Sequence, residues 1–182
     1  SSNQVLSNEK RENLKQNPSS QIDTEAKSTE KNGKKYFGYK GHINVDGKTK
    51  LIQKQSFTPA NVHDIKEFEN LLIGDETEVY ADKAYQSKDL SRKAKLVGVK
   101  YKVMKKANRN RPLREDEKIY NKELSKTRAR VEHIFASIKN DFNFKICRAK
   151  NQIRNKLKWI MSCLIYNMRR TIFLLKPVTS MG

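Results

Sequence analysis

Two carboxylates in this sequence are placed where acidic side chains could hold a metal ion. Asp82 ends the short run Val79-Tyr80-Ala81-Asp82, which has the pattern of a β-strand, and Glu132 lies in a later stretch with helical periodicity. The carboxyl end of a strand is where α/β sheets present ligand-binding groups. An Asp at a strand end, facing a Glu on a helix, can hold Mg²⁺ through oxygen atoms and leave positions for phosphate. This pattern predicts metal-dependent phosphoryl transfer.

Arg128, Glu132 and Lys139 form one charged stripe on the predicted helix. At about 100° per residue, the three positions fall within about 40° of one another. The two cations could neutralise or grip the phosphates that flank the metal site. The ordinary alternative is an exposed set of helical ion pairs worth a few tenths of a kcal/mol each. For Asp82 the ordinary alternative is a turn or helix-capping residue.

A third group of charges lies in the basic stretch from 105 to 118, which Pro112 interrupts. Its Lys, Arg and Asn content indicates a loop. Because this basic loop leads into the helix that carries Glu132, near the proposed phosphate site, we expect it to contact a nucleic-acid backbone. The alternative is a loop that is merely solvated. The candidate contact residues are Lys105, Lys106, Arg109 and Arg111.

The formal net charge of +19 far exceeds what solubility requires and indicates a polyanionic partner. Residues 1–90 carry 14 basic and 14 acidic side chains, whereas residues 91–182 carry 25 basic and 6 acidic ones. A neutral half beside a basic half favours a nucleic-acid track over the uniform basic coat of a histone-like or ribosomal protein. We therefore expect a nucleic acid as the partner, ahead of an acidic membrane surface.

The cysteines and the apolar stretches bear on the compartment. Cys147 and Cys163 have neither metal-ligand spacing nor the pattern of a disulfide framework, which favours a reducing cytoplasm. The most apolar stretch, Trp159 to Met168, is about half the length that a bilayer span needs. We expect a cytoplasmic, nucleoid-associated protein with no membrane segment.

Periodicity predicts the elements that position these residues. Residues 1–34 are polar and resemble a flexible linker or insertion. An antiparallel hairpin follows over 36–57, with Asp46-Gly47 as a two-residue turn. A helix is expected over 63–72, capped by Gly74, and a strand-helix-strand unit over 78–103.

Two longer helices complete the chain. One is predicted from Ile119 to Asn140, and the other, Ile153 to Leu175, has apolar residues at helical spacing and is expected to be a packed core helix. Together the elements predict the α/β (α+β) class, a mixed sheet flanked by helices. We expect one domain over 35–176, between the polar segment 1–34 and a tail at 177–182.

The charged stripe also matches the Y-x2-R-x3-E-x6-K signature of DDE transposases, with Ser125 in the Tyr position followed by Arg128, Glu132 and Lys139. Four further segments resemble the insertion-sequence-five family and occur in that family's order. The resemblance covers roughly residues 20–175. The segments are Tyr36–His42, Thr58–Asp64, Tyr80–Tyr85 and Arg128–His133.

This resemblance implies a ribonuclease-H-like fold in which Asp82 and Glu132 are the second and third members of a metal-binding triad. It implies Mg²⁺ or Mn²⁺ as cofactor, and transposon-end and target DNA as partners. It also allows a homodimer in a synaptic complex.

The first aspartate of that triad has no clear counterpart. In the family it lies on an opening strand that precedes a polar insertion, and residues 1–34 resemble that insertion. Asp23 is the sole aspartate before Asp46, and its neighbours have no strand pattern. We therefore expect a domain without its first strand, whose status as an enzyme stays open.

Three functions follow as alternatives. The first is an N-terminally truncated transposase domain, which when complete cleaves and joins DNA. The second is a catalytically inactive, DNA-binding remnant. The third is a ribonuclease-H-like nuclease unrelated to transposition, which would not need the Arg-x3-Glu-x6-Lys stripe.

Overall fold

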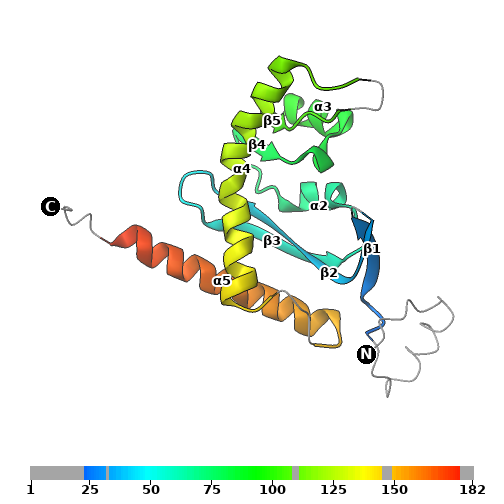
Figure 1. Ribbon diagram of the computed structural model, residues 1–182. Coiled ribbons are helices and arrows are strands. Elements are labelled where there is room, and N and C mark those ends of the chain that lie inside the picture. The colour runs from blue at the N-terminus through cyan, green and yellow to red at the C-terminus, as the bar shows by residue number, and fades with distance from the viewer. Residues whose placement is uncertain (1–22, 32, 108–110, 145–148, 177–182) are drawn as a thin grey trace.

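The computed structural model describes residues 23–31, 33–107, 111–144 and 149–176. Over these residues the chain forms a mixed α/β structure with two small sheets and four α-helices (Figure 1). The strands are β1 (Lys27–Lys31), β2 (Lys34–Val45), β3 (Ile52–Pro59), β4 (Glu78–Ala81) and β5 (Lys100–Val103). The helices are α2 (Asp64–Leu71), α3 (Lys88–Leu96), α4 (Glu115–Asp141) and α5 (Gln152–Leu175), with a 3₁₀ turn η1 (Lys83–Tyr85).

The first sheet is antiparallel and has the order β1-β2-β3. β2 pairs with β3 from Tyr39↔Pro59 to Val45↔Ile52, which confirms the predicted hairpin. β1 lies inside the stretch 1–34 that the sequence predicts to be a linker. Its residues Lys-Ser-Thr-Glu-Lys lack the apolar alternation of a strand, but their backbone pairs with the first five residues of β2. Backbone pairing, rather than side-chain burial, therefore determines this strand.

The turn between β2 and β3 is longer than the two residues predicted at Asp46-Gly47. The backbone N–H groups of Lys48 and Thr49 both donate to the Asp46 carboxylate, at 3.2 and 2.6 Å. Lys50 then has a positive φ of 61°, and β3 begins at Ile52. An Asp side chain that bonds the backbone two and three residues on favours this wider loop over a tight turn.

The second sheet is the predicted strand-helix-strand unit. β4 and β5 are parallel, from Glu78↔Lys100 to Ala81↔Val103, and α3 connects them. The Ser87 hydroxyl accepts from the Leu90 N–H at 3.3 Å and caps α3, while Gly98 ends the helix region with a φ of 76°. Local signals were sufficient to predict this unit.

Helix α4 passes both sheets in Figure 1 and reaches α5 at its lower end. It begins at Glu115, four residues before the predicted start at Ile119. The Glu117 carboxylate accepts from the Arg114 N–H at 3.1 Å, and the first turn is acidic. Both features stabilise the amino end of a helix.

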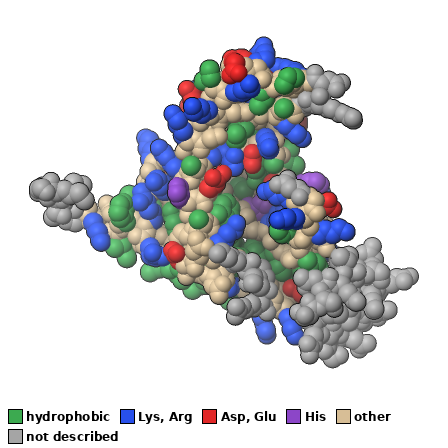
Figure 2. Space-filling model, viewed as in Figure 1, with side chains coloured by type: hydrophobic (Ala, Val, Ile, Leu, Met, Phe, Trp, Pro, Cys, Tyr) green, Lys and Arg blue, Asp and Glu red, His purple; other side chains and the backbone are tan. Residues whose placement is uncertain are grey.

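Helix α5 begins one residue before the predicted start at Ile153 and ends at Leu175 as predicted, but the prediction of a packed core helix is wrong. One face, with Asn155, Trp159, Ser162 and Cys163, is buried against the first sheet and α4. Most of the predicted apolar stripe lies on the exposed side, and Figure 2 shows hydrophobic and basic side chains along this helix. The exposed residues include Ile153, Leu157, Met161, Leu164, Met168 and Ile172. Periodicity identified the helix but not the face that meets the domain.

Each of the two sheets has its own hydrophobic core. Ile52, Phe57, Ile134, Ile138, Trp159 and Cys163 are buried between the first sheet and helices α4 and α5, and Phe68, Ala81, Leu90 and Val103 are buried around the second sheet. None of the helices in the described part of the chain is both long and apolar enough to cross a membrane.

Candidate functional site

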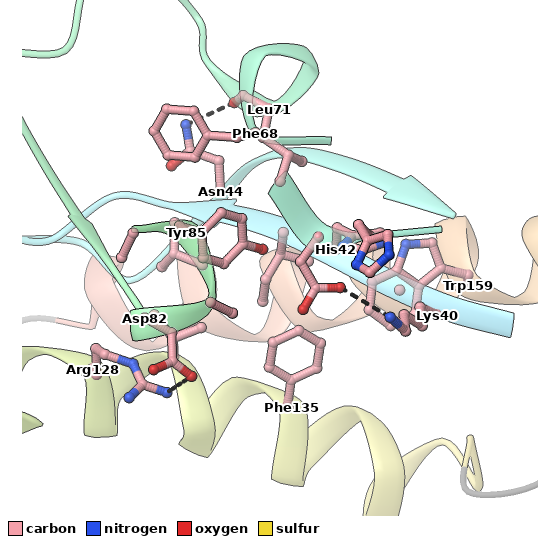
Figure 3. Close-up of a pocket in the computed structure, with 18 of the residues that line it drawn as sticks. Lys40, His42, Asn44, Phe68, Leu71, Asp82, Tyr85, Arg128, Phe135 and Trp159 are labelled. Carbon is pink, nitrogen blue, oxygen red and sulfur yellow. Dashed lines mark hydrogen bonds and ion pairs between the residues drawn. The ribbon is translucent and has the colours of Figure 1, made fainter. Parts of the chain in front are cut away.

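Asp82 directly follows β4 and precedes η1, as its position in the sequence predicts. One carboxylate oxygen, Oδ1, accepts from the Lys83 N–H at 2.6 Å and caps η1. The other, Oδ2, lies 3.3 Å from the Arg128 guanidinium (Figure 3). Asp82 therefore combines the capping role with a second oxygen that faces α4.

Arg128 connects the two predicted carboxylates. Its Nη2 atom lies 3.3 Å from Asp82 Oδ2 and 3.4 Å from Glu132 Oε1. Its Nη1 atom lies 3.2 Å from the sulfur of Met104. The structure thus brings Asp82, at a strand end, and Glu132, on a helix, to the same guanidinium group. The sequence predicts that these two carboxylates lie together. The Glu132 side chain is 67% exposed and that of Asp82 37%, so solvent weakens both ion pairs.

The other predicted basic residues divide into two groups. Lys106 and Lys139 line the same cavity as Asp82 and Arg128. Lys105 and Arg111 instead contact the start of α4: the Lys105 N–H donates to Asn121 at 2.8 Å, and Arg111 pairs with Glu117 at 3.0 Å. Arg109 lies outside the described residues.

Ser125, which takes the Tyr position of the signature, forms a hydrogen bond within α4. Its hydroxyl donates to the Asn121 carbonyl at 2.8 Å. Its side chain is exposed and does not line the cavity that holds Asp82.

The cavity itself has a volume of about 2260 Å³ and lies between β2, β4, α2 and α4. It also holds residues that spacing alone did not single out. Lys40 forms an ion pair with Asp64 at 3.2 Å, and Tyr85 lies between these elements in Figure 3. Burial, together with the nearby charges of Asp64 and Asp82, raises the pKa of Tyr85 to about 12. All three residues occur in the segments that carry the family resemblance. That resemblance was the one sequence feature that could have identified them as cavity residues.

The donor set fits a divalent cation only in part. Carboxylate oxygens are the ligands that Mg²⁺ prefers, and Asp82 and Glu132 supply them. Within the described ranges, no group of three or more His, Cys, Asp or Glu side chains could hold a metal ion. Asp23 lines the same cavity but forms no such group with Asp82 and Glu132, and its carboxylate accepts from the Tyr39 hydroxyl at 2.8 Å and from the N–H groups of Glu25 and Ala26. Asp23 thus connects the residues just before β1 to Tyr39 of β2.

No solved structure matches this chain. A sequence profile of the transposase DDE domain matches residues 11–168. The match covers most of the chain, including β1, both sheets and the stripe of Arg128, Glu132 and Lys139. The DDE domain of a transposase acts on DNA, which is consistent with the basic second half. The chain belongs to the transposase DDE domain family.

Proposed function

We propose that this chain is the catalytic part of an insertion-sequence transposase of the insertion-sequence-five type, with a ribonuclease-H-like fold. The observation that carries the proposal is the contact of one guanidinium, that of Arg128, with both Asp82 and Glu132. A strand end and a facing helix supply these carboxylates, and two carboxylates can share a divalent cation.

In this proposal Asp82 and Glu132 hold Mg²⁺ or Mn²⁺. The chemistry that such a cation would supply there is the activation of a water or a 3′-hydroxyl and the stabilisation of the leaving oxygen at phosphorus. Arg128 neutralises the carboxylates before the cation binds and contacts a phosphate afterwards. Lys106 and Lys139, on the wall of the same cavity, hold the DNA backbone on either side.

A third carboxylate is still required, because Asp23 does not join Asp82 and Glu132 in a group that could hold a metal ion among the described residues. We propose that it comes from a strand that the described residues do not include, so that the domain over 35–176 is truncated at its amino side. The chain by itself would then bind transposon-end and target DNA without cleaving it. Two copies, one at each transposon end, would form the synaptic complex.

The alternative function is a DNA-binding remnant, and the incomplete carboxylate set among the described residues favours it. A nuclease unrelated to transposition is less consistent with the family match. Both remaining candidates predict DNA binding, and they differ in whether Asp82 and Glu132 still bind a cation.

The test is a Mn²⁺ titration of the chain by electron paramagnetic resonance. We expect weak binding that Asp82→Asn and Glu132→Gln each reduce. Asp116→Asn is the matched control, since Asp116 pairs with Arg114 at the exposed start of α4. If all three variants bind Mn²⁺ as the unchanged chain does, the carboxylate pair is not a metal site and the remnant is the better description.

A further inference from the structure

Asp82 lies at the start of the η1 turn, and Tyr85 ends the same turn. The Asp82 carbonyl accepts from the Tyr85 N–H at 2.9 Å, and the Asp82 carboxylate accepts from the Lys83 N–H at 2.6 Å. Both bonds lie within the turn, so they shape it without attaching its far end to the rest of the domain. The hydrogen bonds of a 3₁₀ turn have poor geometry, so a single turn of this kind needs outside support to stay fixed.

Tyr101 supplies a bond to η1 from outside the turn. It lies on β5, opposite Val79 of β4, and its hydroxyl donates to the Tyr85 carbonyl at 2.7 Å. Burial raises the pKa of Tyr101 to about 12, so the hydroxyl keeps its proton and remains a donor at neutral pH. One end of η1 is therefore continuous with β4, and the other end is bonded to the strand that pairs with β4.

Phe68 of α2 holds the two tyrosine rings in place. Its ring centroid lies 5.7 Å from that of Tyr85 and 5.3 Å from that of Tyr101. Aromatic pairs at such separations stabilise a structure beyond the area that they bury. Figure 3 shows Tyr85 between Phe68 and Asp82. The packing of α2 thus orients the ring whose hydroxyl bonds the turn.

We propose that Tyr101 is a positioning residue for Asp82, because its bond to the Tyr85 carbonyl fixes η1 and so keeps the Asp82 carboxylate directed at α4 beside Glu132. The role rests on the proposed function, in which these two carboxylates hold the cation. Tyr101 is not among the residues that line the large cavity, so it acts through the turn rather than on the cation. Without the bond, only the fraction of molecules with both carboxylates in place would bind the cation, which lowers the apparent affinity.

The first test compares two substitutions in the Mn²⁺ titration of the whole chain by electron paramagnetic resonance. Tyr101→Phe should weaken Mn²⁺ binding by about 2- to 12-fold, the range that one hydrogen bond can supply. Tyr166→Phe is the matched control, because the Tyr166 hydroxyl also donates to a backbone carbonyl, that of Lys50 at 3.1 Å. Urea denaturation should show a similar loss of stability in both variants, whereas Mn²⁺ affinity should fall only in Tyr101→Phe.

The second test asks whether Tyr101 acts through Asp82. In the Asp82→Asn background, Tyr101→Phe should cause no further loss of the weak Mn²⁺ binding that remains. In the Glu132→Gln background it should still weaken binding, because Asp82 is present. Replacing Tyr101 with 4-aminophenylalanine, which keeps a donor at the same ring position, should restore the affinity of the unchanged chain.

The outcomes separate this role from the proposed function. If Asp82→Asn alone leaves Mn²⁺ binding unchanged, the proposed metal site fails, and the role of Tyr101 fails with it. If Asp82→Asn weakens binding but Tyr101→Phe weakens it no more than Tyr166→Phe does, only the role of Tyr101 is overturned. The same holds if Tyr101→Phe has an equal effect in the Asp82→Asn background, or if it prevents folding, since the hydroxyl would then support the domain in general.

Discussion

Arg128 keeps two side chains of like charge together, because its Nη2 atom lies within 3.4 Å of both Asp82 and Glu132. Carboxylates that share a site without a cation repel each other. Mg²⁺ binds oxygen at about 2.0–2.1 Å, which is closer than a guanidinium hydrogen bond. A divalent cation would therefore compete with Arg128 for the same oxygens. Arg128 therefore holds the two carboxylates together and also competes with a divalent cation for their oxygens.

We predict that Arg128→Met raises the affinity of the chain for Mn²⁺. Exposed ion pairs are worth about 0.2–1 kcal/mol each, so losing two of them should strengthen Mn²⁺ binding by about 2- to 30-fold. The measurement is the Mn²⁺ titration, and Arg130→Met is the control, because Arg130 donates to the Gly47 carbonyl at 2.7 Å instead. A weaker affinity in Arg128→Met would show that the guanidinium helps, rather than opposes, cation binding.

His42 gives a second prediction, this time on pH. Its ring is buried and Nε2 lies 2.9 Å from the Thr58 hydroxyl. Burial lowers the pKa of His42 below 6.5, Lys40 adds to this, and the charges of Asp64 and Glu67 oppose it. The unfolded chain therefore takes up a proton at a higher pH than the folded one. The stabilisation is present above the unfolded pKa and is lost as pH falls through it toward the lowered folded pKa.

We expect the free energy of unfolding to fall between about pH 7 and pH 5, where carboxylates with ordinary pKa values contribute little. Urea denaturation at each pH measures it. His42→Gln should flatten this dependence, while His63→Gln, at an exposed position, should leave it unchanged. If the free energy of unfolding varied with pH in the same way in the unchanged chain and in His42→Gln, His42 would not be the cause of the pH dependence.

Among the elements, β2 and α5 meet at one unusually close contact. A Cβ atom on Gly41 would overlap the ring of Trp159, whose buried side chain also stacks on Phe57 and Phe135. The absence of a side chain at Gly41 therefore lets α5 pack directly on the strand. Adding volume to a well-packed core costs about 1–3 kcal/mol.

Gly41→Ala should thus lower the free energy of unfolding by about 1–3 kcal/mol, measured by urea denaturation. Gly47→Ala is the matched control, because no atom lies within 4 Å of a Cβ there. Equal stability of the two variants would mean that the Trp159 ring moves aside at little cost.

The sequence predicted elements best where the determining signal is local. The unit over 78–103 depends on Ser87, Gly98 and alternating apolar residues, and it was predicted almost fully. The turn after β2 was not, because the Asp46 carboxylate reorganises it. The strand β1 and the buried face of α5 depend on partners distant in sequence, which periodicity does not contain.

The residues of the candidate site also differ in whether local sequence signals or distant contacts place them. Asp82, Arg128 and Glu132 were predicted from strand position and helical spacing, and the structure brings them together. Asp64 and Lys40 were missed as cavity residues because only the folding of α2 against β2 places them there.

For the molecule as a whole, the basic residues are unevenly distributed. The excess of basic residues lies entirely in residues 91–182, which contain α4 and α5. Lys106 and Lys139 from this half line the cavity that also holds Asp82. A DNA backbone at this cavity would contact these two lysines. Each phosphate contact releases counterions, so it steepens the dependence of binding on salt.

We predict that Lys106→Ala and Lys139→Ala each reduce the slope of log affinity against log salt concentration by about one. The measurement is fluorescence anisotropy of a labelled DNA duplex over a salt series. Lys66→Ala is the control, because Lys66 is exposed on α2, in the neutral half, and does not line the cavity. If all three substitutions changed the slope equally, DNA would be responding to net charge alone. A selective loss at Lys106 and Lys139 would instead place the DNA at the cavity that Asp82 lines.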